Sequence, residues 1–323
     1  MPKISVIIPI YGTERYVEKC VRSVMDQTLK DIEILCIDDC SPDNSAAIVE
    51  QLAATDDRVR LIRHERNLGL GGARNTGISE ARAPYVAGVD SDDHIVPEMM
   101  EELWNGTGGK IADVVVCGIN FVDDNGRPVG PSTSPEPGHL VNTNNQVDIL
   151  DQFNPGFVNK LWRTSLFMDT GIRFPEHCYY EDLATTPRIL HHARDIRVIA
   201  GDFYQYVIRD GSITQSSSPK HIIDYFRTFE ILDHFLKQEG LQSIYEEKFA
   251  KQIGKMLSYH AWSILESSMA EEQKEQYLRH MLLLKLGFLA HNDSLLKLDA
   301  KALQRLLLNS KNGDELPPFP KDL

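Results

Sequence analysis

The first part of the chain switches repeatedly between two hydrophobic patterns. Short apolar runs rich in β-branched residues and bounded by turn-forming residues predict buried strands. These runs are residues 4–8, 32–38, 58–63, 85–90 and 113–121. Between them, apolar residues recur three or four positions apart, as from Val17 to Val24, which predicts helices. The alternation predicts an α/β layer with a mainly parallel sheet and helices on both faces.

Further helices and one long loop complete this α/β part. The helices are expected around Val49, at residues 72–81 and at residues 97–104. A hairpin turn is predicted at Asn125-Gly126. Residues 127–156 are rich in Pro, Gly, Ser, Thr and Asn and predict a long surface loop, of the kind that often binds ligands, so we expect acceptor contacts there.

The pattern becomes helical from residue 219 onward. One apolar stripe covers residues 222–236 and another covers residues 245–257. We therefore expect a domain of residues 1–218 followed by a helical region of residues 219–323. The sequence leaves open whether these helices shape an acceptor pocket, bind a partner, form a homo-oligomer or touch a membrane.

Charge and cysteine content narrow the class of protein. The net charge of −13 and the lack of a basic run argue against binding to nucleic acid, whose phosphates attract clusters of Lys and Arg. The five cysteines lack CxxC spacing, which favours buried thiols in a reducing compartment. The chain enters its first strand without a charged leader or an apolar signal core, and we expect a cytoplasmic protein, with peripheral contact to a membrane left open.

Three carboxylates follow the strand predicted at residues 85–90. Asp90, Asp92 and Asp93 stand at its carboxyl end, which is where open α/β sheets place their ligands. Like charges this close repel one another unless a cation lies between them, and oxygen ligands suit Mg²⁺ or Mn²⁺ bridging to substrate phosphates. The motif therefore predicts a metal and a phosphorylated ligand. The alternative is an acidic turn that caps the helix near Pro97.

A second acidic pair, Asp38-Asp39, ends the second predicted strand on the same edge of the sheet. One Asp in this position can accept a hydrogen bond from a nucleobase N–H or from a ribose hydroxyl. The alternative is that Asp38 is structural and that Asp43 caps the next helix.

The glycine-rich run that starts at Gly69 is not a dinucleotide-binding fingerprint. It follows the third predicted strand instead of the first, and Arg74 stands where the last Gly or Ala is required, which excludes a dehydrogenase. The glycines still allow a ligand to approach the backbone closely. Arg74 either faces a phosphate or holds the Asp90 loop by an ion pair.

Two later segments carry further candidate chemistry. Glu181-Asp182 stands at the predicted start of a helix, where one carboxylate can face a pocket and act as a base, although acidic residues are common in first turns. Residues 204–214 read as a loop in which Arg209 is a candidate phosphate clamp, the alternative being a solvated loop Arg. His94 is either a metal contact or a neighbour that forms hydrogen bonds with the acidic motif.

Taken together, these motifs resemble the family-2 glycosyltransferases of GT-A fold, over roughly the first two-thirds of the chain. The order and spacing of the motifs carry the resemblance more specifically than any one of them alone. They are Pro9-Ile-Tyr11, Glu14, Asp38-Asp39 with Asp43, Asn67-Leu-Gly69 with Ala73-Arg74-Asn75, Asp90-Ser-Asp92-Asp93, Glu181-Asp182 and Arg209 with Ser212-Ile-Thr214.

The resemblance implies a role for each matching residue. It implies that Pro9, Tyr11, Glu14, Asp39, Arg74, Asp90 and Arg209 bind the nucleotide-sugar, that Asp92 and Asp93 hold Mn²⁺ or Mg²⁺, and that Asp182 is the catalytic base. The implied enzyme is a metal-dependent inverting hexosyltransferase that moves a sugar from a UDP-sugar to a hydroxyl of a glycan or lipid-linked glycan, as in polysaccharide biosynthesis.

Two rival hypotheses remain. A nucleotidyltransferase shares an acidic metal site but needs a basic, glycine-rich loop after the first strand, which Ile8-Pro9-Ile10-Tyr11 does not provide. A catalytically inactive glycan- or nucleotide-binding protein on the same fold is the alternative from another class, and the presence of both Asp92 and Asp182 argues against it.

Overall fold

The computed structural model describes residues 1–142, 154–209, 219–245, 248 and 274. The chain divides into two compact units, residues 1–212 and residues 213–323. The domain boundary predicted between residues 218 and 219 stays a prediction, because residues 210–218 lie outside the described part.

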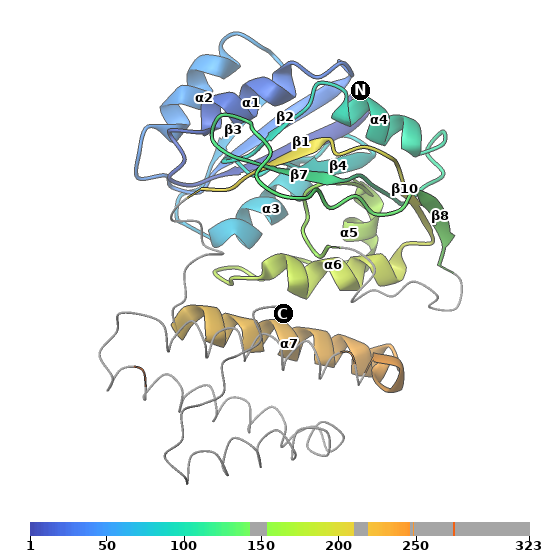
Figure 1. Cartoon of the computed structure of the whole chain (residues 1–323). Coiled ribbons are helices and arrows are strands. Elements are labelled where there is room, and N and C mark those ends of the chain that lie inside the picture. Colours follow the sequence, from blue (N-terminus) through green and yellow to red (C-terminus); the bar gives the residue numbers. More distant parts are fainter. Residues whose placement is uncertain (143–153, 210–218, 246–247, 249–273, 275–323) are drawn as a thin grey trace. The chain divides into compact units, whose positions relative to one another are not determined.

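The first unit is built on an eight-stranded sheet (Figure 1). Its strands, in spatial order, are β3 (Val59–Arg63), β2 (Ile32–Asp38), β1 (Ile4–Ile10), β4 (Tyr85–Gly88), β9 (Lys160–Arg163), β6 (Val114–Val116), β10 (Asp195–Val198) and β8 (Gly138–Val141). The first four strands pair in parallel, as the alternation of strands and helices predicts. Strand β9, by contrast, runs antiparallel between β4 and β6.

A smaller sheet of three strands lies beside the main one. In spatial order it contains β5 (His94–Ile95), β11 (Tyr204–Val207) and β7 (Ile119–Val122). The prediction of a loop over residues 204–207 was wrong, because these residues pair with both neighbours. The single strand predicted at residues 113–121 is divided between β6 and β7, which belong to different sheets.

Helices cover both faces of the main sheet (Figure 1). On one face lie α1 (Val17–Met25), α2 (Ser45–Ala53) and α4 (Met99–Gly106), and on the other lie α3 (Gly69–Glu80), α5 (Thr164–Thr170) and α6 (Glu181–His192). Helix α3 packs closely on β1, since a β-carbon placed on Gly77 would lie 2.4 Å from Cγ2 of Ile7. A glycine is therefore needed for α3 to reach the sheet at this point.

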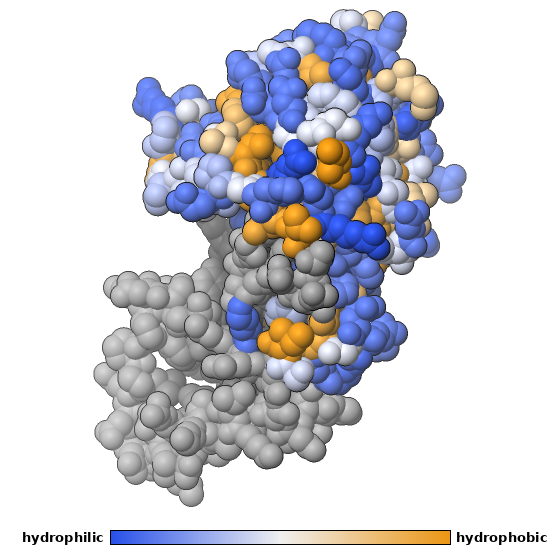
Figure 2. Space-filling model, turned by 90° about the vertical axis from the view of Figure 1, so that its right-hand side faces the viewer, coloured by the Kyte–Doolittle hydropathy of each residue, from blue (hydrophilic) through white to orange (hydrophobic). Residues whose placement is uncertain are grey.

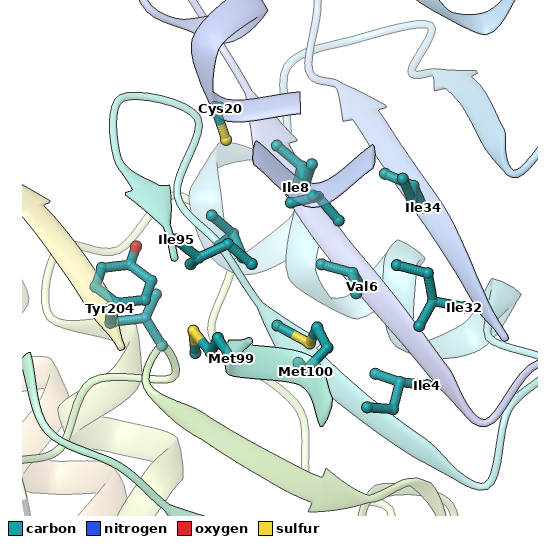
Figure 3. Packing of buried hydrophobic residues seen from close by; sticks show 14 of the residues in the cluster. Ile4, Val6, Ile8, Cys20, Ile32, Ile34, Ile95, Met99, Met100 and Tyr204 are labelled. Carbon is teal, nitrogen blue, oxygen red and sulfur yellow. The ribbon is translucent and has the colours of Figure 1, made fainter. Parts of the chain in front are cut away.

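The largest core lies between the sheet and α1, α2 and α4. Successive side chains of a strand point to opposite faces, and Ile4, Val6 and Ile8 of β1 all contribute to this core (Figure 3). The side chains of Met99 and Met100 from α4 close it from the side of β4. All five cysteines are free thiols and four of them are buried, as the sequence analysis expected.

Of the second unit, the structure describes mainly helix α7 (Pro219–Gln238). Phe226, Phe229, Leu232 and Leu236 are buried, in agreement with the predicted stripe, while the helices predicted beyond residue 248 lie outside the described residues. None of the helices in the described part of the chain combines the length and the apolar character needed to cross a lipid bilayer. On the face shown in Figure 2, apolar residues of the described part form small separate groups among hydrophilic ones, which is usual for a protein surface.

Candidate functional site

The candidate residues gather where the strand order reverses. The chain adds β2 and β3 on one side of β1 and then places β4 on its other side, and ligands of open α/β sheets bind at the carboxyl ends of strands around such a point. Hydrogen bonds join the loop after β1 to the loop after β4 and to the start of α2. Thr13 Oγ1 donates to Ser91 Oγ at 3.1 Å, and the backbone N–H of Thr13 donates to Ser45 Oγ at 3.0 Å.

The loop after β1 holds the first three predicted residues. Pro9 lies inside β1, whereas Tyr11 is 55% exposed just beyond the strand. Glu14 Oε2 accepts hydrogen bonds from the backbone N–H and the side-chain amide of Asn44, and the Glu14 N–H donates to Asp43 Oδ2. Glu14 therefore binds the residues just before α2 by hydrogen bonds, and its contact with a nucleotide stays a prediction.

Asp39 is the anchor of helix α3. Its Oδ1 accepts from the N–H of Leu68 and lies 2.7 Å from Nδ1 of His64, while its Oδ2 accepts from the N–H of Gly69. The carboxylate satisfies N–H groups that lack partners at the helix start, so α3 begins at Gly69 and not at the predicted residue 72. Asp38 accepts from a backbone N–H in the turn that follows, as its structural alternative expects. The binding of a nucleobase by Asp39 stays a prediction.

The glycines at the start of α3 allow a close approach of the protein's own backbone. A β-carbon on Gly71 would lie 2.3 Å from the carbonyl oxygen of Pro175, and one on Gly69, which has φ +76°, would lie 3.0 Å from the backbone nitrogen of His177. The sequence analysis expected these glycines to admit a ligand. In the structure Gly69 and Gly71 bring the segment of residues 174–177, which leads into Glu181, against α3, and the approach of a ligand stays a prediction.

Arg74 joins two of the predicted acidic motifs. Its Nη2 donates to Asp90 Oδ1 at 2.9 Å and its Nη1 donates to Glu181 Oε1 at 2.5 Å. The guanidinium carbon lies 5.5 Å from the ring centroid of Phe157 and 5.6 Å from that of Phe174, and Arg74 is only 2% exposed. Burial opposes its charge, but the two carboxylates raise the pKa of Arg74 above its ordinary value. Of the two roles left open by the sequence, the structure shows the ion pair with the Asp90 loop.

Asp182 stands in the first turn of α6, next to the Glu181 that Arg74 binds. The residue before the helix, Tyr180, has φ +61°, so the chain turns sharply into the Glu181-Asp182 pair. Asp182 is partly exposed, and its Oδ1 accepts from the N–H of Leu183 at 2.8 Å. Its low-dielectric surroundings raise the pKa of the Asp182 carboxyl and Arg74 lowers it, with a net rise. A raised pKa suits a carboxylate that takes up a proton near neutral pH.

Arg209 binds the middle carboxylate of the acidic motif. Its Nε donates to Asp92 Oδ2 at 3.0 Å, and its Nη2 makes a second bond to the same oxygen. The guanidinium carbon also lies 5.0 Å from the ring centroid of Tyr16, just before α1. Arg209 thus has protein partners and is not the solvated loop residue of the alternative interpretation.

Asp93 points into the protein. Only 4% of it is exposed, its Oδ2 accepts from the Tyr204 hydroxyl at 2.6 Å, and its Oδ1 accepts from the N–H of Val207 at 2.8 Å. The same Tyr204 hydroxyl accepts from the N–H of Asp90 at 3.2 Å. These bonds attach β11 to the acidic motif and thereby help to position the backbone at Arg209, which follows β11. A metal contact by Asp93 stays a prediction.

The acidic motif offers a metal few protein ligands. In the ranges that the structure describes, no three His, Cys, Asp or Glu residues come together in an arrangement that would hold a metal ion. Mg²⁺ and similar ions, however, are often held by one or two carboxylates together with substrate phosphates. The partly exposed carboxylate of Asp92 fits that mode. Burial lowers the pKa of His94 to about 4 and keeps its ring neutral, which is the form in which imidazole binds metals, and a metal contact by His94 stays open.

Lys160 is a buried cation that the sequence analysis missed. It lies in β9 and is 0% exposed, and its Nζ donates to the carbonyl oxygen of Gly156 and to Oδ1 of Asn159, both at 2.8 Å. The signal in the sequence was a single lysine inside the apolar run that ends at Trp162.

The loop predicted at residues 127–156 contains β8, and residues 143–153 of it lie outside the described part.

Comparison with known proteins shows which protein family the chain resembles. The chain matches the family model described as glycosyl transferase family 2 over residues 5–167. It is 29% identical over 267 residues to the putative glycosyltransferase EpsH of Bacillus subtilis (strain 168), which covers 80% of this chain and 75% of EpsH. It is 35% identical over 217 residues to the poly(ribitol-phosphate) beta-glucosyltransferase of Bacillus spizizenii, which covers 65% of this chain and 33% of that enzyme.

A solved structure supports the same comparison. The crystal structure of S. aureus TarS residues 1–349 in complex with UDP-GlcNAc has a TM-score of 0.59 to this chain and 25% sequence identity, and the match covers 88% of this chain and 73% of TarS 1–349. The likeness and the mixed α/β architecture confirm the predicted GT-A fold.

Proposed function

The chain belongs to glycosyl transferase family 2 and is a glycosyltransferase, and we propose that it moves a sugar from a UDP-sugar to a hydroxyl of a glycan, with inversion and with the help of a divalent metal. The observation that carries the proposal is the Arg74 bridge. One guanidinium binds both Asp90, at the carboxyl end of the β4 strand segment, and Glu181, next to Asp182. A donor-binding motif and a candidate base are thereby held within the span of one side chain.

The donor lies, in this proposal, along the rim formed by the loops after β1, β2 and β4. We assign the exposed ring of Tyr11 and the carboxylates of Asp39 and Asp90 to the nucleoside, where Asp39 would accept a hydrogen bond in addition to those from the start of α3. The complex of TarS with UDP-GlcNAc supports UDP as the nucleoside diphosphate of the donor. Asp92 would hold the metal together with the donor phosphates. A divalent ion bound there supplies positive charge that stabilises the diphosphate as it gains negative charge.

Asp182 acts as the general base of the transfer. The acceptor oxygen forms a bond to the anomeric carbon while the bond from that carbon to the diphosphate oxygen breaks, and the acceptor proton passes to the Asp182 carboxylate. Attack from the face opposite the leaving group inverts the anomeric configuration. The partial exposure of Asp182 supports this role, because an acceptor hydroxyl has to come within hydrogen-bond reach of it.

Arg209 serves as the cation for the leaving diphosphate. Its guanidinium is bound to Asp92, the candidate metal ligand, so it already stands at the position where phosphate oxygens are expected. A planar guanidinium with several N–H donors matches phosphate geometry well. Its charge stabilises the separated diphosphate more than the intact donor, which lowers the barrier to transfer.

The acceptor is a hydroxyl of a glycan or lipid-linked glycan chain. The matched enzyme of Bacillus spizizenii is named for glucosyl transfer to poly(ribitol-phosphate), a hydroxyl-bearing polymer, which supports an extended acceptor for this chain as well. The sugar that is transferred depends on pocket contacts that discriminate between donors, and a hexose from a UDP-hexose is our expectation.

Replacing the base tests the proposal most directly. We expect Asp182→Asn to bind donor normally and to lower the transfer rate by about 10²–10⁴-fold, because the amide cannot accept the acceptor proton. Asp169→Asn, an equivalent change of an exposed aspartate in α5, is the matched control and should transfer at the wild-type rate. Transfer by Asp182→Asn at the wild-type rate would overturn the assignment of the base.

Calorimetric titration with UDP, with and without Mn²⁺, tests the donor site separately. We expect binding that is strengthened by Mn²⁺ and that loses this dependence in Asp92→Ala. Binding of UDP that is equally tight with and without metal, in the wild type and in Asp92→Ala, would contradict the metal proposal. If UDP does not bind but another nucleoside diphosphate does, the donor class has to be reassigned while the transfer chemistry stands.

A further inference from the structure

We propose that Lys160 is a positioning residue for the transfer reaction: its ammonium group holds the turn of residues 156–159 against Asp182 and keeps positive charge beside that carboxylate. The inference rests on the proposed role of Asp182 as the base. It adds a residue that lies outside the acidic motifs and that is provided by strand β9, the antiparallel strand next to β4.

Among the residues that the structure describes, those that bind the Lys160 ammonium group all lie in the turn that precedes β9. Its Nζ lies 2.8 Å from the carbonyl oxygen of Gly156, 2.8 Å from Oδ1 of Asn159 and 3.5 Å from the carbonyl oxygen of Val158. The Asn159 amide is itself fixed, because its Nδ2 donates to the carbonyl oxygen of Cys117 in the segment after β6. The ammonium group therefore determines the path of the backbone from residue 156 to residue 159.

The charge of Lys160 needs an explanation of its own. The described residues include no carboxylate in an ion pair with its Nζ, and burying a cation without one is costly. An apolar side chain of similar length, such as Met, would fill the same space without burying a charge, but it would leave the Gly156 carbonyl oxygen and Asn159 Oδ1 without this donor. The turn therefore gains something from a cation that packing alone does not require.

The turn held by Lys160 lies directly against the candidate base. A β-carbon placed on Gly156 would lie 3.8 Å from Asp182 Oδ2, so the carbonyl that accepts from Lys160 belongs to a residue in near contact with the carboxylate. The same turn also packs against β4, since a β-carbon on Gly88 would lie 2.4 Å from the ring of Phe157. Displacement of this turn would therefore disturb the surroundings of both Asp182 and β4.

The balance of charge around Asp182 shows what the lysine contributes. The titratable groups that act on Asp182 are Glu181 on α6, Asp90 after β4, Arg74 on α3 and Lys160 on β9. Three carboxylates thus share two cations, and both hydrogen-bonded faces of Arg74 are already used by Asp90 and Glu181. Without Lys160 one cation would face three carboxylates, and Asp182 would take up a proton at higher pH and lose its function as a base.

Lys160 is protonated in the pH range where this matters. Burial lowers the pKa of its ammonium group to about 7, so below neutral pH it carries a positive charge. Where Asp182 takes up a proton below neutral pH, the positive charge of Lys160 opposes that protonation. The lysine therefore acts by keeping Asp182 ionised as the pH falls.

Titration of Asp182 by NMR tests the proposal without any substrate. In protein labelled with ¹³C at the aspartate carboxyl groups, the Asp182 signal is identified by its loss in Asp182→Asn. We expect the midpoint of its titration to move to higher pH in Lys160→Met and in Lys160→Gln, of which the second keeps an N–H donor for the turn. Asn159→Gly is the matched control, because it loosens the same turn, suits the φ of +57° at that position and keeps the charge.

The outcomes separate this inference from the proposed function. An unchanged Asp182 midpoint in both folded Lys160 variants, or an equal rise in Asn159→Gly, would overturn the role of the charge. With UDP-GlcNAc as the probe donor and UDP release as the signal, the acid limb of the rate should move to higher pH in Lys160→Met, and the rate at neutral pH should fall by about 10²-fold from misplacement of the turn. If Asp182→Asn releases UDP at the wild-type rate, the proposed base fails, and the NMR result still decides whether Lys160 controls the carboxyl.

Discussion

Arg74 and Arg209 bind the same acidic motif in opposite ways. Arg74 donates to two carboxylates, Asp90 and Glu181, and its side chain is 3% exposed and lies beside two aromatic rings. Among the described residues, Arg209 donates to Asp92 alone, and its side chain is 24% exposed just after β11. The two arginines thus hold neighbouring aspartates, one in the interior and one at the rim of the site.

This difference in burial means that the ion pairs of Arg74 are a fixed part of the fold, whereas the ion pair of Arg209 can be exchanged for a ligand. Removing one partner of a buried ion pair leaves uncompensated charge in a medium of low dielectric, so the Arg74 bridge behaves as a permanent part of the fold. A partly exposed pair is weakened by water and salt, and a ligand can replace it at small cost. We therefore expect Arg74 to set where the motifs lie and Arg209 to respond to what binds there.

The largest expected effect comes from Arg74→Ala. The change leaves the buried Glu181 and the partly exposed Asp90 without their shared cation, and we expect the free energy of unfolding to fall by about 3–5 kcal/mol. Urea denaturation followed by circular dichroism measures this directly. A loss below about 1 kcal/mol would mean that the bridge is not structural.

Arg22→Ala is the matched control for that experiment. Arg22 also binds a carboxylate, Glu18 on the preceding turn of α1, but both side chains are more than half exposed. Exposed pairs of this spacing contribute about 0.3–0.5 kcal/mol, so the variant should unfold almost as the wild type does. Equal losses in the two variants would remove the distinction between buried and exposed arginines.

Tyr204→Phe tests the hydrogen bonds that attach β11, the strand before Arg209, to the acidic motif. The hydroxyl of Tyr204 donates to buried Asp93 and accepts from the N–H of Asp90, so its removal leaves both groups without that partner. We expect a loss of about 1–3 kcal/mol in the free energy of unfolding, measured by urea denaturation. Because Arg209 follows β11 by two residues, the transfer rate should fall as well, and an unchanged rate would show that the position of Arg209 does not depend on this bond.

Much of this arrangement was predictable from the sequence, because it depends on local patterns. The periodicity located β1 to β4 and their helices, and the clustering of acidic residues after strands located the rim of the sheet. The contacts that distinguish the residues were not predictable. Arg74 and Glu181 are 107 positions apart, and only the closed fold brings them together. Asp39 has the same local pattern as a ligand-binding aspartate, yet its carboxylate is bound by the start of α3.

Strand β9 was missed for a related physical reason. It is a four-residue strand that runs antiparallel inside an otherwise mostly parallel sheet, and a run this short has no distinctive period. Its lysine was not identified as a candidate, because nothing local shows that Nζ is bound by the preceding turn. Long-range pairing, and not propensity, decides the structure there.

Lys160 offers a prediction of intermediate size through the pH dependence of stability. Its pKa is lowered from 10.5 to about 7 on folding, so between these pH values the unfolded chain binds more protons than the folded one. Stability from this group therefore rises with pH over that window, with a slope of at most about 1.4 kcal/mol per pH unit. Urea denaturation at pH 7, 8.5 and 10 should show the wild type gaining stability relative to Lys160→Met, and parallel curves would contradict the lowered pKa.

Arg209→Ala should have the smallest effect on stability and a clear effect on binding. Because the pair with Asp92 is partly exposed, we expect the free energy of unfolding to change by less than about 1 kcal/mol. Removing the guanidinium also removes the group that competes with a metal for the Asp92 carboxylate. Calorimetry without nucleotide should then show tighter Mn²⁺ binding than in the wild type.

The transfer rate of Arg209→Ala completes the comparison with Arg74. Loss of a cation that stabilises the leaving diphosphate should lower the rate by about 10²-fold while the protein stays folded, whereas Arg74→Ala should lose rate and stability together. Arg209→Lys keeps a charge but not the planar set of donors, and it should fall between the wild type and the alanine variant. If Mn²⁺ bound no more tightly to Arg209→Ala than to the wild type, the two ligands would not share Asp92, and Arg209 would be as permanent a part of the site as Arg74.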